Sequence, residues 1–206
     1  MLSGAAVCDP GHWDAQYRAG PVPWDTPRPC GELRRVLAGY GVRPCRALEA
    51  GCGTGGNAVW LASRGFDVVA VDLSRVALRR ARRCAAAAGV GVRFVAADLT
   101  DAALSLGGPF DFFFDRGCYH AVRLADGPAY LRTLRRLTRP GALGLVLMGN
   151  AAEPEDAVGP PVLTEAEVRA EWGSTFDLVR LRAFRFDPSH DNKRYLGWSC
   201  LVRRTG

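Results

Sequence analysis

The segment 47–57, ALEAGCGTGGN, most constrains the fold of this chain, because an apolar run containing Glu49 is followed by four glycines within six residues. The apolar run predicts a strand, and the residues from Asn57 to Arg64 predict a helix. A turn with almost no side chains lets backbone N–H groups and a helix N-terminus approach a ligand closely. The segment therefore predicts a binding site for a nucleotide-type cofactor.

The length of 206 residues suits one α/β domain that can bury a core without disulfides or metals. No stretch approaches the ~18 apolar residues of a membrane span, and no basic segment precedes an apolar core near residue 1. The seven cysteines lack CxxC or zinc spacing, which favours free buried thiols. We therefore expect a single domain over residues 1–206, located in the cytoplasm, with no metal site and no membrane partner.

The net charge of +6 comes almost wholly from arginine, since Lys193 is the only lysine among 27 basic residues. The arginines are spread over several predicted helices rather than gathered in one block with interleaved aromatic residues. That distribution favours solvated helix faces over a nucleic-acid surface. We therefore expect no nucleic-acid partner.

Strand and helix patterns alternate along most of the chain. The predicted strands are 46–50, 67–71, 92–96, 111–115, 142–148, 177–186 and 195–203. The predicted helices are 12–18, 32–38, 57–64, 74–88, 128–137 and 164–172. The last two strands have no helix between them, so we expect them to pair antiparallel. This order predicts an α/β fold with a doubly wound, Rossmann-like, seven-stranded and mostly parallel sheet whose last strand is reversed.

The first 40 or so residues are predicted to form an arm. Trp13 and Tyr17 lie four residues apart and so share one face of the first helix, either to pin it to the core or to contact a ligand. The following segment 21–29 cannot sustain a helix, because its four prolines lack an N–H group and favour extended geometry. We expect this segment, which contains Trp24, to serve as a surface arm or lid.

Three acidic residues lie at or near the ends of three consecutive strands, where ligands bind in open α/β sheets. Glu49 precedes the glycines, Asp72 closes the second strand and Asp98 closes the third. Residues 51–56 also match G-x-G-x-x-G, which fits a dinucleotide enzyme. Asp72 could accept the ribose hydroxyls of NAD or of S-adenosylmethionine. Asp98 followed by Leu99 suits an adenine amine held between apolar side chains, and Glu49 suits the cationic end of a sulfonium cofactor.

This set resembles the class I S-adenosylmethionine-dependent methyltransferases, whose pattern is acid-x-Gly-x-Gly-x-Gly, a ribose acid and an adenine Asp. Further motifs resemble the thiopurine S-methyltransferase and thiol or halide methyltransferase group over residues 12–203. These motifs are Trp13, Tyr17, Gly20, Pro23-Trp24-Asp25, Phe114-Asp115-Arg116-Gly117 and Gly159-Pro160-Pro161.

The resemblance implies S-adenosyl-L-methionine as the cofactor, with the N-terminal arm folded over it and Arg116 in the substrate pocket. The implied cofactor contacts are Trp13, Tyr17, Trp24, Glu49, Gly51, Cys52, Gly53, Asn57, Asp72, Leu73, Asp98, Leu99 and Asp115. Asp115, Arg116 and His120 are the candidate catalytic residues. From the residues alone, Arg116 could instead pair with Asp115, and His120 could act as a base or cap a helix.

Methyl transfer from a sulfonium is an in-line displacement that depends mainly on holding the nucleophile and the methyl group close and collinear. We therefore predict a monomeric methyltransferase for a small molecule with a thiol or another soft nucleophile, such as a thiopurine, halide, tellurite or selenol. The alternatives are a small-molecule O- or N-methyltransferase, an NAD-dependent oxidoreductase and a cofactor-binding protein without transfer. Methylation of RNA or protein would suit the pI of 9.2, but no Asn-Pro-Pro-Tyr-type tetrapeptide is present.

Overall fold

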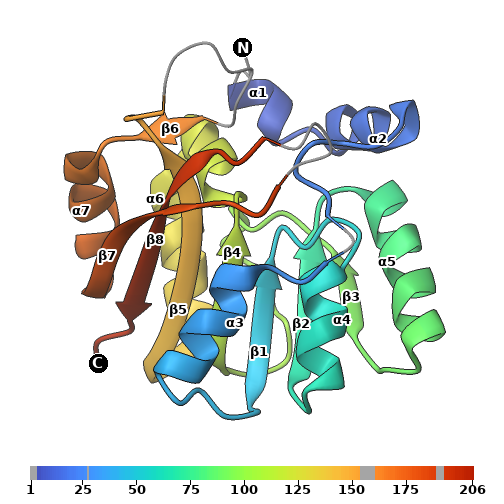
Figure 1. The fold of residues 1–206 in the computed structure, drawn as a ribbon, viewed down its shortest axis with the longest axis horizontal. Helices are drawn as coiled ribbons and strands as arrows, with labels where there is room; N and C mark the ends of the chain where they lie inside the picture. Colours follow the sequence, from blue (N-terminus) through green and yellow to red (C-terminus); the bar gives the residue numbers. More distant parts are fainter. Residues whose placement is uncertain (1–3, 27, 154–160, 189–192) are drawn as a thin grey trace.

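The computed structural model describes residues 4–26, 28–153, 161–188 and 193–206 (Figure 1). Gly159, Pro160 and the predicted loop residues 189–192 lie outside these ranges. The helices are α1 (Gly4–Val7), α2 (Pro10–Ala19), α3 (Gly31–Gly39), α4 (Gly56–Ser63), α5 (Arg75–Ala88), α6 (Tyr119–Leu137) and α7 (Glu165–Gly173). The strands are β1 (Arg46–Ala50), β2 (Asp67–Asp72), β3 (Arg93–Ala96), β4 (Phe110–Arg116), β5 (Thr138–Asn150), β6 (Val162–Leu163), β7 (Asp177–Arg185) and β8 (Leu196–Arg203).

The sheet has the strand order β3-β2-β1-β4-β5-β8-β7, and the two-residue strand β6 pairs with β5. The strands from β3 to β5 run parallel, whereas β8 is antiparallel to both of its neighbours, β5 and β7. This confirms the predicted α/β class, the mostly parallel sheet and the reversed last strand. It also follows that β7 runs in the direction of β5 and ends at the same edge of the sheet as the other parallel strands.

Helices cover both faces of the sheet because successive strand residues point to opposite sides. Phe112 and Phe114 of β4 pack with residues of α3 and α4 on one face, and Phe113 packs with residues of α6 and α7 on the other. Figure 1 shows α3 and α4 on one side of the sheet. All three of these phenylalanine rings are fully buried. The predicted central strand is therefore confirmed, and it separates the two halves of the core.

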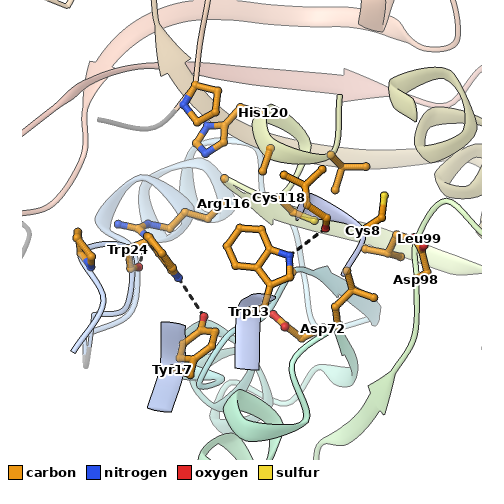
Figure 2. A pocket seen from close by; sticks show the side chains of 18 of the residues that line it. Cys8, Trp13, Tyr17, Trp24, Asp72, Asp98, Leu99, Arg116, Cys118 and His120 are labelled. Carbon is orange, nitrogen blue, oxygen red and sulfur yellow. Dashed lines mark hydrogen bonds between the residues drawn. The ribbon is translucent and has the colours of Figure 1, made fainter. Parts of the chain in front are cut away.

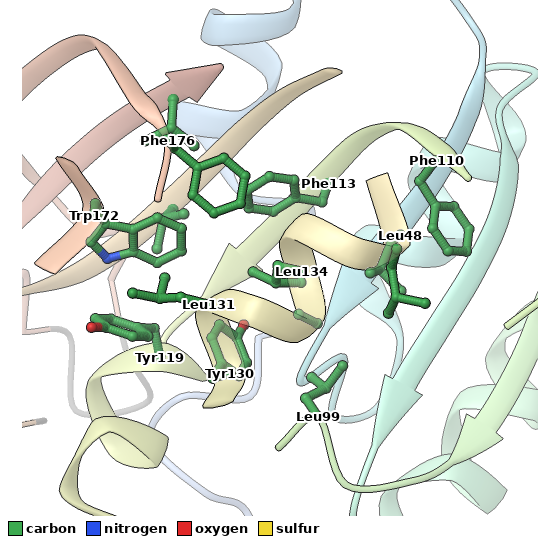
Figure 3. Close-up of a cluster of buried hydrophobic side chains, with 14 of the residues drawn as sticks. Leu48, Leu99, Phe110, Phe113, Tyr119, Tyr130, Leu131, Leu134, Trp172 and Phe176 are labelled. Carbon is green, nitrogen blue, oxygen red and sulfur yellow. The ribbon is translucent and has the colours of Figure 1, made fainter. Parts of the chain in front are cut away.

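The core beneath α6 and α7 is built on aromatic stacking (Figure 3). The ring of Phe113 lies 6.3 Å from that of Trp172 and 5.6 Å from that of Phe176, centroid to centroid. A Cβ atom on Gly144 of β5 would lie 2.0 Å from Cζ of Phe113. Glycine at position 144 therefore lets the Phe113 ring lie against the neighbouring strand and reach this cluster.

The helix boundaries follow local capping chemistry. The side chain of Ser74 accepts a hydrogen bond from the N–H of Ala77, and Thr164 forms a capping box with Glu167, so both predicted helix starts are confirmed. The predicted helix 128–137 is only the second half of α6. Residue Asp126 has non-helical dihedral angles and its side chain caps Ala129, and a separate turn of helix precedes it from Tyr119.

The predicted turn at residues 139–141 is wrong, because β5 already begins at Thr138 and pairs with β4 through an irregular register. The seven cysteines are free as expected, but only Cys30, Cys52 and Cys200 are buried and Cys84 is exposed. In the described part of the chain, no helix is both long and apolar enough to cross a bilayer. Helices α1 and α2 lie at the top of Figure 1, the end toward which the arrows of β1, β2 and β4 point.

Candidate active site

The glycine-rich turn joins β1 to α4 in a conformation that only glycine adopts readily. Gly51 and Gly53 have φ angles of +66° and +53°. A Cβ atom at Gly51 would lie 2.6 Å from Cβ of Cys118, and one at Gly53 would lie 2.8 Å from the hydroxyl oxygen of Tyr17. The turn is thus packed between the arm and the end of β4, with no room for side chains.

Glu49 lies beneath this turn with one side-chain oxygen left unpaired. The residue is 2% exposed, and its Oε1 accepts a hydrogen bond from Nδ2 of Asn57 at 3.2 Å. Its Oε2 is buried and has no hydrogen-bond partner among the described residues. Burial raises the pKa of Glu49 to about 8, against the smaller opposing effect of the Asn57 hydrogen bond. An unpaired buried carboxylate oxygen fits a cationic group such as an amino-acid ammonium.

Asp72 and Asp98 lie at the carboxyl ends of β2 and β3 and line one pocket. The two carboxylate oxygens of Asp72 accept the N–H groups of Ser74 and Gly53, each at 2.8 Å, so this side chain ties the glycine-rich turn to β2. Oδ1 of Asp98 accepts the N–H of Thr100, and its other oxygen has no partner among the described residues. Each carboxylate therefore keeps an acceptor position for a ligand.

Aromatic side chains of the arm close the pocket. Trp24 donates its indole N–H to the hydroxyl of Tyr17 at 3.1 Å, and the ring of Trp13 meets that of Trp24 edge-on, with 5.9 Å between centroids. The indole N–H of Trp13 is donated to the carbonyl of Val7. In Figure 2 the Trp13 ring lies between Asp72 and Asp98 on one hand and Arg116 and His120 on the other. The two rings thus hold α2 in place and also line the pocket, and their contact with a ligand stays a prediction.

The arm is held in place by polar contacts to α5 and to the glycine-rich turn. Asp14 of α2 accepts hydrogen bonds from the Ser74 hydroxyl at 2.7 Å and from the Val76 N–H at 3.0 Å. A carboxylate at the N-terminus of α5 also interacts favourably with the helix dipole. Thr54 of the turn donates its hydroxyl to Asp25 of the arm. The sequence does not predict Asp14 as a site residue, and it marks Asp25 only as part of the Pro23-Trp24-Asp25 motif, without a contact assigned to it.

Arg116 joins the arm to the far side of the pocket. Its Nη1 donates to the carbonyl of Trp24 at 2.7 Å, and its guanidinium lies 5.3 Å from the centroid of the Phe186 ring. Its Nε is buried without a partner among the described residues. Arg116 does not pair with Asp115, so the alternative of a local ion pair is not observed in the structure.

Asp115 is fully buried and holds the start of α6. Its carboxylate accepts the N–H groups of Cys118 and Tyr119 at 2.8 and 2.9 Å and the hydroxyl of Tyr130 at 2.6 Å. Burial raises the pKa of Asp115 to about 6, and these hydrogen bonds oppose the rise. Asp115 therefore fixes the turn that follows Arg116, the last residue of β4, and does not itself line the pocket.

The pocket brings together most of the residues that the sequence predicted. Ten of them line it: Trp13, Tyr17, Trp24, Gly51, Asp72, Leu73, Asp98, Leu99, Arg116 and His120. The other five do not line the pocket: Glu49, Cys52, Gly53, Asn57 and Asp115. Lining residues that the sequence reasoning missed include Cys8, Cys118, Phe186, Asp187 and Tyr195.

The rule that found Asp98 applies to Asp187 once the strand order is known. It follows β7, and β7 ends at the ligand-binding edge of the sheet because it runs parallel to β5. The segment from Asp187 onward was interpreted only as a loop. The carboxylate of Asp187 accepts a hydrogen bond from the N–H of Gly31 at 2.8 Å and so caps the N-terminus of α3, which is distant in the sequence.

The site combines acceptors at three strand ends with an apolar, aromatic cavity. In the described ranges, no three His, Cys, Asp or Glu side chains are grouped so that they could hold a metal ion. Carboxylates at the ends of β1, β2 and β3 suit, in turn, an ammonium group, ribose hydroxyls and an adenine amine. The fold and this site define a class I S-adenosylmethionine-dependent methyltransferase.

Comparison with known proteins agrees with this class. The model of the thiopurine S-methyltransferase family matches residues 8–201, and the chain belongs to that family. A solved structure described as "Conversion of a Disulfide Bond into a Thioacetal Group during Echinomycin Biosynthesis" is 27% identical, with a TM-score of 0.80, and covers 96% of this chain and 93% of that one.

Two further relatives match this chain over a shorter part of its length. The tRNA 5-carboxymethoxyuridine methyltransferase of Escherichia coli (strain K12) is 36% identical over 58% of this chain and 46% of its own length. The 2-heptyl-1-hydroxyquinolin-4(1H)-one methyltransferase of Mycobacteroides abscessus is 31% identical over 71% of this chain and 65% of its own length. The chain thus spans about half to two thirds of these relatives. S-adenosylmethionine is the cofactor of the family, and the unpaired Oε2 of Glu49 fits its amino group.

Proposed function

We propose that this protein transfers a methyl group from S-adenosylmethionine to the sulfur atom of a small molecule. The observation that carries the proposal is the guanidinium of Arg116, which lines the pocket together with apolar and aromatic side chains such as Trp24 and Phe186. The carboxylate of Asp187, which also lines the pocket, already accepts a hydrogen bond from the N–H of Gly31. One fixed positive charge in an apolar cavity favours a compact anionic nucleophile, such as a thiolate. The solved structure whose description concerns a disulfide bond, which matches nearly the whole chain, also supports sulfur as the acceptor atom.

The residues of the site would bind and orient the cofactor and the methyl acceptor, and none of them needs to exchange a proton. When bound, S-adenosylmethionine supplies a methyl group made electrophilic by the positive sulfonium. Glu49, Asp72 and Asp98 would hold the amino, ribose and adenine parts, and Arg116 would hold the negative charge of the nucleophile. The arm over residues 1 to about 40 would act as a lid that excludes water, which strengthens the electrostatic contacts inside. Correct positioning alone can lower the barrier by ~7–11 kcal/mol.

A second candidate is methylation of oxygen, because the relative named for a hydroxyquinolone substrate is 31% identical over 71% of this chain. The same cationic pocket end would bind a hydroxylate. Methylation of tRNA is less well supported, because the tRNA methyltransferase matches over only 46% of its own length.

A panel of acceptors separates these functions. Purified protein is incubated with methyl-labelled S-adenosylmethionine and with thiophenol, phenol or aniline, which differ only in the nucleophilic atom. The proposal predicts labelled product from thiophenol in clear excess over the other two. Transfer to phenol alone would support the O-methyltransferase alternative and contradict the proposal.

Replacing Arg116 with alanine is expected to lower kcat/KM for thiophenol by about 10- to 100-fold, because the thiolate loses a charge-assisted partner worth ~1.5–3 kcal/mol. Arg116→Lys keeps the positive charge but loses the planar guanidinium whose Nη1 donates to the carbonyl of Trp24. We therefore expect an intermediate loss in kcat/KM. Arg64→Ala is the matched control, since Arg64 also lies over an aromatic ring, that of Trp60, but does not line the pocket. Unchanged turnover by Arg116→Ala would show that this assignment is wrong.

A further inference from the structure

His120 is held in one tautomeric state by its contact with β5. The residue lies in the first turn of α6, is 8% exposed and lines the pocket. Its Nδ1 meets the backbone N–H of Gly149 at 3.1 Å. A backbone N–H can only donate, so Nδ1 must offer its lone pair. The neutral imidazole therefore carries its proton on Nε2.

The protonated nitrogen belongs to a side chain that lines the cavity. A Cβ atom at Gly117 would lie 3.2 Å from Nε2, so the missing side chain of this glycine keeps the space in front of the ring open. Nε2 has no hydrogen-bond partner among the described residues, and it is not one of the fully occluded unpaired atoms. The Nε2–H group is therefore a donor that the fold presents to the pocket without using it.

The surroundings of His120 keep its ring neutral. The titratable and charged side chains that line the pocket with it, beyond the cofactor acids, are Cys8, Tyr17, Arg116, Cys118, Asp187 and Tyr195. Burial, together with the nearby positive charge of Arg116, lowers the pKa of His120 to about 3. Protonation would also place an N–H on Nδ1 directly against the N–H of Gly149. Asp187 is engaged with the N–H of Gly31 and does not pair with the imidazole.

We propose that His120 donates its Nε2–H to a hydrogen-bond acceptor on the substrate, next to the sulfur, and does not act as a general base. This rests on the proposed sulfur methylation. A suitable substrate carries a hydrogen-bond acceptor beside its sulfur, as the thiopurines that give the family its name do. The thiolate lone pair forms the new S–C bond, the old C–S bond breaks with its electron pair left on the cofactor sulfur, and no proton passes to the protein.

The tautomer can be measured on the wild-type protein without any substrate. Long-range ¹H–¹⁵N spectra should show His120 protonated at Nε2 and unprotonated at Nδ1, with no change from about pH 8 to about pH 5, where an ordinary histidine titrates. A proton on Nδ1, or titration within this range, would overturn the proposal. This result does not depend on whether the acceptor atom is sulfur, so it separates failure of the donor role from failure of the proposed function.

Activity of two variants tests the donor itself. In His120→Asn the amide oxygen can still accept from Gly149, but nothing donates from the Nε2 position, whereas His120→Gln places an amide N–H near that position. With 6-mercaptopurine, which has ring nitrogens beside the carbon that bears sulfur, His120→Asn should lose ~10-fold or more in kcat/KM and His120→Gln should recover part of the loss. With thiophenol, which lacks such an acceptor, the loss in kcat/KM for His120→Asn should be clearly smaller than the loss with 6-mercaptopurine.

The pH dependence distinguishes the two roles further. Wild-type kcat/KM for 6-mercaptopurine should follow ionisation of the thiol alone, and His120→Asn should keep the same profile at a lower level. A general base would instead add a histidine ionisation that disappears in His120→Asn. That outcome, or an equal loss for thiophenol and 6-mercaptopurine, would overturn the donor role.

Discussion

Replacing Glu49 with glutamine is expected to weaken binding of S-adenosylmethionine by about 10- to 100-fold near pH 8, while the free protein becomes more stable. The unpaired Oε2 would lose its charge, and a charge-assisted hydrogen bond to an ammonium is worth ~1.5–3 kcal/mol. Glutamine keeps the oxygen that accepts from Asn57, so the local structure is preserved. Isothermal calorimetry measures the affinity, and thermal unfolding measures the stability.

The gain in stability has a predicted pH dependence. The pKa of Glu49 is raised to about 8 in the folded protein from an ordinary value of 4.5. Between these values the folded state retains a proton that the unfolded state has lost, so the wild-type free energy of unfolding falls as pH rises. Glutamine does not ionise, so the free energy of unfolding of Glu49→Gln does not fall with pH for this reason. The stabilisation by Glu49→Gln should therefore be small below pH 4.5, grow between pH 4.5 and about 8, and level off above pH 8. Its upper limit is several kcal/mol, because a tenfold change in ionisation constant is worth ~1.4 kcal/mol.

Wild-type cofactor affinity should rise with pH as the pKa of about 8 is approached, because binding an ammonium favours the ionised Glu49. Glu165→Gln is the matched control, since Glu165 lies in the first turn of α7 and pairs with Arg169 on the surface. If Glu49→Gln bound S-adenosylmethionine as tightly as the wild type, the ammonium site would lie elsewhere.

Replacing Asp72 with alanine is expected to weaken cofactor binding by at least ~100-fold, the larger of the two affinity losses. The substitution removes an acceptor for the ribose hydroxyls, and it also releases the N–H groups of Gly53 and Ser74 that the carboxylate holds at 2.8 Å. Two charge-assisted hydrogen bonds are worth ~3 kcal/mol or more together. Calorimetry with S-adenosylhomocysteine gives the affinity without turnover.

Asp67→Ala controls for the loss of a carboxylate from β2. Asp67 begins the strand that Asp72 ends, and its side chain is exposed and makes only a 3.6 Å contact with Arg46. Its substitution should leave cofactor affinity unchanged. A loss of affinity for Asp72→Ala that is no greater than that for Asp67→Ala would remove Asp72 from the cofactor site.

The fold was largely predictable because buried strands and capped helices leave periodic signals. The three phenylalanines 112–114 mark the central strand, and Ser74 and Thr164 mark the starts of α5 and α7. Features set by tertiary contacts were not predictable. The two-residue strand β6 has no periodicity. Residues 139–141, expected as a turn, instead form an irregular part of β5 that skips its register with β4, and the N–H of Gly141 donates to the carbonyl of Arg204.

The site was predictable where a residue follows a parallel strand, as Asp72, Asp98 and Arg116 do. It was not predictable where the contact comes from distant segments that the fold brings together. Asp187 reaches the pocket only because β8 inserts between β5 and β7, and strand order cannot be obtained from one sequence. The tautomer of His120 likewise depends on Gly149, which is 29 residues away in β5.

A crystal structure with S-adenosylhomocysteine tests the account of this site most directly. We predict that the amino group of the ligand lies within hydrogen-bond distance of Glu49 Oε2, the ribose hydroxyls at Asp72 and the adenine amine at Asp98. The ligand sulfur should face the cavity that contains Arg116 and His120. A ligand bound in the opposite direction, with adenine at Glu49, or bound outside this pocket, would contradict the account.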